Sequence, residues 1–349
     1  MKLKEKLTNK YLMKIFDSLA AGDCSATRRF LNKHLPFLKE VLFELKKFDK
    51  GKEFDNDIYF YIGESLLKTD SKSAYIAFEK GAEHFNLKSL DVIARAYGNG
   101  ENGYERNLIK SVDLYKKIIT RSDGSPLIGK TYRNLGIIYL FHLKNKDEKA
   151  AYEFFEKGAF LNDPYCLFRI ALAYRDGKCG FKQDIHKSLE LFNKIEKLDY
   201  DSNKQIIAYG YLYRCIGETY SSSDYGIEDW ETALKYYEKG ASMNDSFCLL
   251  IIGSAFLDGE FGYKKNPEKA IAFFKKALKA GEDDKAVLST IYANLGDVYL
   301  YDINEPKIAL KYYEKGASLD DFHSLCEIAK AYGEGVGHIR NLTKSLEFY

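Results

Sequence analysis

The tetrapeptide Glu-Lys-Gly-Ala occurs four times in this chain, at nearly regular intervals. The copies begin at Glu79, Glu156, Glu238 and Glu314, so successive copies are 77, 82 and 76 residues apart. An alanine followed by an aromatic residue repeats with the same three spacings, at Ala96, Ala173, Ala255 and Ala331. Two landmarks that keep the same offsets mark a duplicated structural unit. We therefore expect a solenoid, in which each repeat contacts only its neighbours.

Each long unit contains two related halves, and each half predicts a helical hairpin. Apolar residues spaced three and four positions apart form one face of a helix. One small residue stands inside the first helix of every half: Gly63, Ala94, Gly136, Ala171, Gly217, Gly253, Gly296 and Ala329. Glycine in mid-helix costs about 1 kcal/mol relative to alanine, so its repeated use indicates that another segment packs closely there. Eight such positions predict eight hairpins.

The second helix of alternate hairpins has a recognisable start. Asn107, Asp184, Asn266 and Asn341 each stand three residues before a lysine. Asn and Asp side chains accept hydrogen bonds from the first turn of a helix, so these residues are predicted N-caps. The loops before them repeat glycine at matching places, but no phosphate-binding G-x-x-x-x-G-K-[ST] string is present. Turn geometry explains these glycines better than ligand contact does.

The complete pattern is a small residue, then x-x-x-Leu-Gly-x-x-Tyr, a glycine-containing loop, Asn/Asp-x-x-Lys-Ser/Ala, two aromatic residues and Lys-Gly/Ala-Ala. It resembles Sel1-like repeats, a branch of the tetratricopeptide-type helical repeats. The resemblance implies an all-α fold, a right-handed α-solenoid of about eight antiparallel helix hairpins used for protein–protein assembly. We place the solenoid at residues 54–349, with repeats at 54–88, 89–126, 127–162, 163–208, 209–244, 245–286, 287–320 and an incomplete 321–349.

The two ends depart from the repeat. Residues 1–53 do not match it and are predicted to form an N-terminal helical cap, which a solenoid needs at its end. The chain stops at Tyr349, in mid-pattern. An uncovered last hairpin would expose an apolar face. The sequence is therefore read as a fragment or an abbreviated repeat, with self-association through the open last repeat as the alternative.

Composition argues against two classes of partner. The 53 basic and 51 acidic residues leave a net charge of +2. Non-specific nucleic-acid or membrane adhesion needs a large positive excess, so neither partner is expected. No apolar run reaches the 18 residues of a membrane-spanning helix.

The cysteines and the N-terminus favour a cytoplasmic protein. Cys166 and Cys248 occupy a repeat position that holds serine in other copies, which indicates small buried side chains. The other cysteines form no regular pairs, so reduced thiols are the simpler interpretation. Lys14 and Asp17 interrupt the apolar segment that a signal peptide needs. A secreted or periplasmic location would follow if a leader had been removed before Met1.

Motifs for catalysis are missing from the sequence. The six histidines are scattered, without H-x-x-x-H or H-E-x-x-H spacing, and no G-x-S-x-G or C-x-x-C string occurs. We therefore expect no enzymatic activity, no metal site and no cofactor.

The resemblance implies which residues would line the concave groove. In this type of repeat the first helices form the concave wall, at positions three and six before and one and four after the central small residue. The predicted groove residues are Asp91, Arg95, Arg133, Tyr165, Phe168, Arg175, Tyr211, Arg214, Glu218 and Phe247. A guanidinium grips carboxylates bidentately and aromatic rings supply an apolar wall, so the groove fits an extended acidic-hydrophobic peptide. The alternative is that these arginines pair with carboxylates on adjacent helices.

These observations predict a non-catalytic scaffold or adaptor that binds a protein or peptide along its concave groove. One alternative is an inhibitor or immunity-type protein that neutralises a single enzyme or toxin. Another is a secreted bacterial effector that binds host proteins. Stoichiometry separates the first two, because a scaffold holds two partners at once and an inhibitor holds one.

Overall fold

The described residues form an all-helical chain built from hairpins. The computed structural model describes residues 57–121, 125–198, 206–281, 284–335, 341 and 345, and contains no strand among them. The chain divides into two compact units, Met1–Ile170 and Ala171–Tyr349, which we call unit 1 and unit 2. The boundary falls within α10 (Pro164–Asp176). The predicted cap at 1–53 lies outside the described residues.

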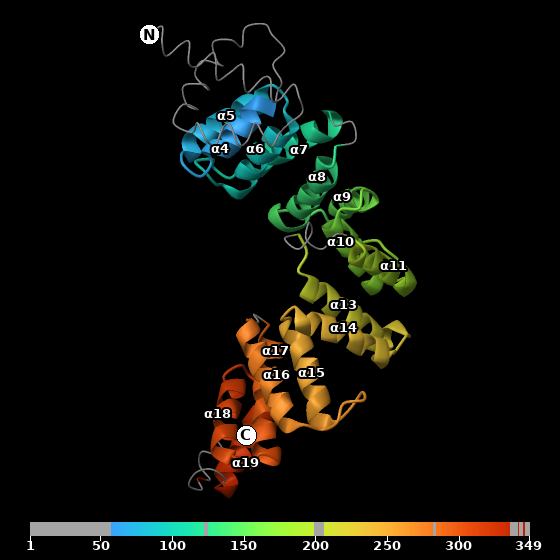
Figure 1. The fold of residues 1–349 in the computed structure, drawn as a ribbon, viewed down its shortest axis with the longest axis vertical. Helices are drawn as coiled ribbons and strands as arrows, with labels where there is room; N and C mark the ends of the chain where they lie inside the picture. Colours follow the sequence, from blue (N-terminus) through green and yellow to red (C-terminus); the bar gives the residue numbers. More distant parts are fainter. Residues whose placement is uncertain are drawn as a thin grey trace. The chain divides into compact units, whose positions relative to one another are not determined.

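Each hairpin pairs a first helix, called an A helix, with a second, called a B helix (Figure 1). The A helices are α4 (Asp57–Leu66), α6 (Leu87–Asn99), α8 (Leu127–Ile137), α10, α13 (Tyr209–Ser221), α15 (Ser246–Asp258), α17 (Lys285–Asp297) and α19 (Phe322–Glu334). The B helices are α5 (Ser71–Glu83), α7 (Leu108–Arg121), α9 (Glu148–Phe160), α11 (Ile185–Glu196), α14 (Trp230–Ser242), α16 (Pro267–Ala280) and α18 (Pro306–Ala317). Eight A helices, each with its central small residue, confirm the helical-repeat fold that the sequence predicts.

The predicted N-caps begin their helices as expected. Asn107, Asp184 and Asn266 each accept a hydrogen bond from the backbone N–H three residues later, at 3.0, 2.9 and 2.8 Å. A helices use the same device, since Asp163 Oδ1 accepts from the Cys166 N–H at 3.0 Å and Asp245 Oδ1 from the Cys248 N–H at 2.9 Å. These bonds satisfy backbone donors that a first helical turn leaves free.

The central glycine of five A helices lies against an aromatic ring of the following B helix. A Cβ added at Gly136 would overlap the ring of Phe155, and one at Gly296 would overlap the ring of Tyr313. Gly63, Gly217 and Gly253 are placed in the same way against Phe78, Tyr237 and Phe274. These rings are almost completely buried, so the glycine is required by the close approach of the two helices.

A different contact joins neighbouring hairpins and explains the tetrapeptide. The glycine of each Glu-Lys-Gly-Ala copy packs on a small residue of the next A helix, in the pairs Gly81–Ser89, Gly158–Cys166, Gly240–Cys248 and Gly316–Ser324. An added Cβ would overlap the side-chain oxygen or sulfur in every pair. Cys166 and Cys248 are fully buried, as predicted, and burial raises the pKa of both thiols. We call these four contacts the tight junctions.

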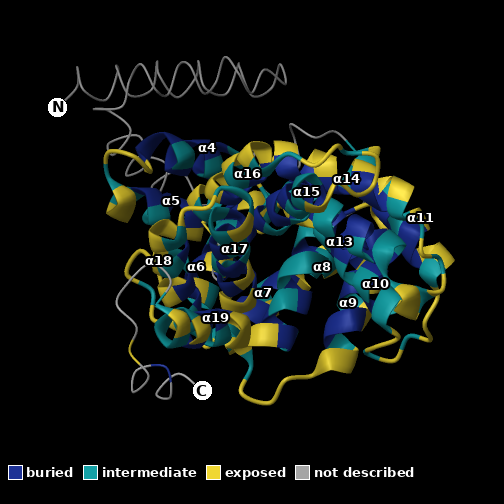
Figure 2. Ribbon diagram, turned by 90° about the horizontal axis from the view of Figure 1, so that it is seen from below, coloured by how far each residue is buried: buried dark blue, intermediate teal, exposed yellow. Residues whose placement is uncertain are grey.

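The junctions between them carry larger residues at the equivalent positions. Ile118, Ile195 and Ala277 replace the glycine on the B helices, and Thr131, Leu212 and Ile291 replace the small residue on the A helices. All six side chains are buried. Figure 2 shows buried residues within the helices and exposed residues both on the loops and on the helices. Two kinds of junction therefore alternate along the chain.

Two A helices end in a wider turn that the sequence did not predict. The segments η2 (Ile138–His142) and η4 (Val298–Asp302) are π-helical turns at equivalent places after α8 and α17. Each exposes an aromatic side chain that reaches the next A helix. The guanidinium of Arg169 lies 5.3 Å from the centre of the Phe141 ring, and the Tyr301 hydroxyl donates to Glu327 Oε2 at 3.0 Å.

The substitution Gly136→Ala should destabilise the protein, because the new methyl group would push the Phe155 ring out of its buried position. We expect a loss of about 1–3 kcal/mol in the free energy of unfolding, measured by urea denaturation. Gly129→Ala is the matched control in the same helix, since an added Cβ there would lie 3.4 Å from the Asp163 Cβ, an ordinary contact. Equal effects of the two changes would contradict the close-approach explanation.

The residue four positions after each tight-junction glycine adopts the left-handed conformation. Asn162, Asn244 and Asp320 have φ angles of 60°, 62° and 64°, and Phe85 takes the same role at 61°. Asn and Asp tolerate this conformation, whereas a bulky residue does so at a cost. At Phe85 the guanidinium of Arg121 lies 3.4 Å from the ring centre, which offsets part of that cost.

The positive φ angle predicts that two small substitutions at Asn162 will differ in their effect on stability. Asn162→Ala should lower the free energy of unfolding by about 1 kcal/mol, because alanine has no means of stabilising a positive φ. Asn162→Gly should change it by only a few tenths of a kcal/mol, since glycine adopts this conformation freely. Thermal melting of the two variants beside the wild-type chain tests the difference, and similar losses in both would refute it.

Candidate partner-binding surface

The A helices of unit 1 line a groove. Its cavity volume is about 370 Å³. The residues at the predicted concave positions that line it are Phe60 and Glu64 from α4, Leu67 directly after α4, Lys88, Asp91 and Arg95 from α6, and Lys130 from α8. The positional rule taken from the resemblance therefore places residues of three successive A helices around one groove. Asp91 and Arg95, both predicted groove residues, are among its lining residues.

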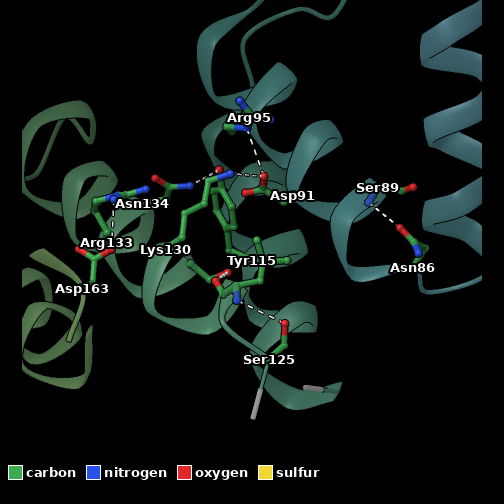
Figure 3. Close-up of polar contacts among 12 residues, drawn as sticks. Asn86, Ser89, Asp91, Arg95, Tyr115, Ser125, Lys130, Arg133, Asn134 and Asp163 are labelled. Atoms are coloured by element: carbon green, nitrogen blue, oxygen red, sulfur yellow. Dashed lines mark hydrogen bonds and ion pairs between the residues drawn. The ribbon is translucent and has the colours of Figure 1, made fainter. Parts of the chain in front are cut away.

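A buried carboxylate organises the charged wall of this groove (Figure 3). Lys130 Nζ donates to Asp91 Oδ2 at 2.6 Å, and Arg95 Nε lies 3.3 Å from the same oxygen. The Asp91 side chain is 5% exposed, whereas Lys130 and Arg95 are 33% and 50% exposed. One carboxylate thus holds two cationic groups from different helices with part of each facing solvent.

The second oxygen of this carboxylate is not satisfied. Asp91 Oδ1 is buried and accepts no hydrogen bond within the part of the chain that the structure describes. The nearby Tyr115 hydroxyl instead accepts from Asn134 Nδ2 at 3.0 Å. Burial, and secondarily the negative charge of Asp91, raise the pKa of Tyr115. An unsatisfied buried acceptor is unfavourable for folding, so stability alone does not explain this arrangement.

Arg133 lies on the same helix as Lys130 but is engaged within the protein. Its Nη1 donates to Asp163 Oδ2 at 3.1 Å, and the two side chains are 13% and 6% exposed. The other oxygen of Asp163 caps α10 through the Cys166 N–H. Arg133 therefore fixes the start of the next A helix rather than presenting a cationic group to a partner.

The aromatic residues predicted on α10 differ in exposure. Tyr165 is partly buried, its ring centre lies 6.0 Å from that of Phe155, and burial raises its pKa. Phe168 is buried and belongs to the core of its unit. Among the aromatics predicted in this region, Phe168 thus offers little surface to a partner.

In unit 2 the predicted arginines share neighbouring carboxylates. Arg175 Nε donates to Asp176 Oδ1 at 2.7 Å, and its Nη1 lies 3.7 Å from Glu218 Oε2. Arg214 Nε donates to Glu218 Oε1 at 2.9 Å. Glu218 therefore stands between two arginines from successive A helices. The alternative stated from the sequence is pairing with carboxylates on adjacent helices, and of these contacts only that between Arg175 and Glu218 joins two helices.

Aromatic side chains adjoin this cluster. The guanidinium of Arg214 lies 4.1 Å from the ring centre of Phe247 and 5.9 Å from that of Tyr211. Tyr211 is 45% exposed. A surface with an arginine held between two aromatic rings is typical of contacts that contribute strongly to protein binding.

Of the carboxylates that hold these cations, sequence reasoning included Asp91 and Glu218 but missed Asp163 and Asp176. Asp163 had a usable signal, because it stands three residues before the small residue of a tight junction, as Asp245 and Asp321 do. No sequence pattern marks Asp176 as the partner of an arginine. Within the described ranges no group of three or more His, Cys, Asp or Glu side chains could hold a metal ion, and no helix is long and apolar enough to cross a membrane.

The hairpins and their junctions agree with the similarity of this chain to known proteins. Seven stretches match the Sel1 repeat, at residues 93–123, 130–163, 164–200, 223–245, 247–282, 292–321 and 323–349. Together they cover more than half of the chain. The chain belongs to the Sel1 repeat family. The first described hairpin, α4 with α5, precedes these stretches but carries the same contacts through Gly63 and Gly81.

Two curated relatives share about a quarter of their aligned residues with this Sel1 repeat protein. Chitin synthase regulatory factor 4 of Schizosaccharomyces pombe is 25% identical over 268 residues, which are 73% of this chain and 38% of the relative. The ERAD-associated E3 ubiquitin-protein ligase component HRD3 of Candida glabrata is 25% identical over 297 residues, 76% of this chain and 35% of the relative. The chain thus spans little more than a third of either relative.

Solved structures show the same fold. The crystal structure of c5321, a protective antigen of uropathogenic Escherichia coli with an SLR fold, superposes with a TM-score of 0.68 at 17% identity, covering 99% of this chain and 75% of that one. A Sel1 repeat protein of Oxalobacter formigenes gives a TM-score of 0.57 at 22% identity, covering 73% and 98%.

Arg133→Ala should destabilise the chain, because it leaves the buried Asp163 carboxylate without its cation. We expect the free energy of unfolding to fall by about 2–3 kcal/mol. Lys235→Ala is the control, since Lys235 and Glu231 form an exposed pair whose loss should change stability by about 0.5 kcal/mol or less. Urea denaturation measures both values, and an unchanged midpoint for Arg133→Ala would show that the pair adds nothing to stability.

Proposed function

We propose that this Sel1 repeat protein is a non-catalytic scaffold that binds a protein or an extended acidic-hydrophobic peptide through the exposed positions of its A helices. Its family and the names of its relatives, a regulatory factor and a ligase component, support a protein-interaction role. The observation that carries the proposal is the groove of unit 1, whose walls come from three successive A helices.

Each unit presents its own surface for a partner. In unit 1, Arg95 and Lys130 present cationic groups beside Phe60 and Leu67. In unit 2, Tyr211 presents an exposed ring beside Arg214. Solvent-exposed cations beside apolar side chains complement a segment that carries acidic and apolar residues together.

Replacing the exposed aromatic residue of unit 2 should weaken partner binding without unfolding the chain. Partners are captured with the intact chain from an extract of its own cells, identified, and purified for titration calorimetry. Tyr211→Ala should lower the affinity by about tenfold or more, as expected for an aromatic contact at the centre of an interface. Ile109→Ala is the control, because Ile109 is an exposed apolar residue on the B helix α7.

The same titration also separates scaffold from inhibitor. Two different partners bound at once to one chain would support the scaffold. A single enzyme bound one-to-one, with its activity lost, would replace the scaffold by the inhibitor proposal. An identified partner that binds Tyr211→Ala as tightly as the wild-type chain, while Ile109→Ala weakens it, would move the surface to the B helices.

A further inference from the structure

The lining of the unit 1 groove carries three cations, Lys88, Arg95 and Lys130, and three carboxylates, Glu64, Asp91 and Glu101, but two of the cations lie on one carboxylate. Arg95 and Lys130 both contact the same oxygen of Asp91, so two cations share one carboxylate. Arg133, Arg175 and Arg214 differ from this pair. Arg133 has Asp163 as its partner, and Arg175 and Arg214 together contact two carboxylates, Asp176 and Glu218, so each of these groups has as many carboxylates as arginines. Among these cations, Arg95 and Lys130 are therefore the two that share a single carboxylate.

These two cations retain donors that face the groove. Arg95 uses Nε toward Asp91, and the structure records no hydrogen bond from its two terminal nitrogens to any described residue. Lys130 uses one of its three protons on Asp91. Because a buried carboxylate holds both groups, their free donors are already positioned before a ligand arrives. Preorganised donors bind an anionic group with a smaller entropic loss than mobile ones.

An apolar surface lies beside the cations in the same groove. Phe60, Leu67 and Val92 line it, and Leu67 is 45% exposed. The groove thus combines two sets of unused donors and an apolar wall within about 370 Å³.

We propose that this groove is a specific subsite for a peptide segment in which one Asp or Glu stands next to a large apolar residue. The peptide carboxylate binds between the Arg95 fork and Lys130, and the apolar side chain packs on Phe60 and Leu67. The inference rests on the proposed function and names the chemistry that unit 1 recognises.

The charge of the site favours a carboxylate over a phosphate. At the contact itself Arg95 and Lys130 exceed Asp91 by one charge, which one peptide carboxylate neutralises, whereas the charges of the whole lining are balanced. A phosphorylated residue carries nearly two negative charges and would stand close to Asp91, with Glu64 and Glu101 also lining the groove. Like-charge repulsion in a partly desolvated groove therefore selects against it.

A random twelve-residue peptide library sorted on the intact wild-type chain tests the proposal. We expect the selected peptides to carry Asp or Glu next to Leu, Ile or Phe. Each selected peptide is then resynthesised with its Glu changed to Gln or its Asp to Asn, and in another version with phosphoserine at that position. Fluorescence polarisation should show about tenfold weaker binding for the amide version, the effect of one lost charge-assisted contact, and weaker binding for the phosphoserine version.

The double variant Arg95→Gln, Lys130→Gln provides the complementary test on the protein. It should bind the selected peptide at least about tenfold more weakly than the wild-type chain. The control Lys116→Gln, Lys117→Gln removes the same charge from exposed positions of α7 and should bind within about twofold. Melting curves establish that both variants are folded, and the peptide amide series tests the same contact on unaltered protein.

Three outcomes would overturn the inference. These are selected peptides without an acidic residue, amide peptides that bind as well as acidic ones, and a phosphoserine peptide that binds more tightly than the carboxylate peptide. Peptides that bind elsewhere on the A helices would leave the scaffold proposal standing while removing this subsite. Failure of both this library and the partner capture with Tyr211→Ala would reject the scaffold proposal as well.

Discussion

The close contact between a glycine and a small residue at the tight junctions is the constraint on which the repeat depends. It brings the end of a B helix against the start of the next A helix, and any side chain larger than hydrogen at the glycine would separate them. The Asn or Asp N-cap of that A helix lies three residues before the small residue, so the contact and the helix start are fixed together. This geometry then sets which A-helix positions remain exposed, and those positions form the groove of unit 1.

The groove shows that a repeat can keep its core positions constant while other positions of the same helices form a surface for recognition. Core positions repeat, whereas the predicted groove positions of the A helices vary from hairpin to hairpin, from Asp91 and Arg95 to Arg214 and Glu218. The cations placed there are held by carboxylates of their own helix or of a neighbouring one. Such pairs contribute little net stability when exposed and more when buried, so they set the orientation of side chains more than they strengthen the fold.

Most of the fold could be predicted from the sequence, because helical hairpins depend on local spacing and on small residues that recur with the period. The N-caps at Asn107, Asp184 and Asn266 and the buried role of Cys166 and Cys248 followed from position alone. The charge pairs could not be predicted in the same way, since Arg133 and Asp163 lie 30 residues apart and their contact depends on the angle between hairpins. The π-helical turn at Ile138–His142 was also missed, because one wider turn leaves the apolar pattern almost unchanged.

The alternation of the two junctions has a consequence for how such a protein can change length. At a tight junction the glycine of the B helix fits a serine or cysteine of the next A helix. At the other junctions an isoleucine or alanine of the B helix is matched with a bulkier residue of the next A helix, such as Thr131, Leu212 or Ile291. Removing a single hairpin would place a B helix of one junction type against an A helix of the other type, leaving either a void or a steric overlap at the new junction. The unit of gain and loss in this array is therefore two hairpins together. Insertion or deletion of two consecutive hairpins preserves the match of side-chain sizes at every junction.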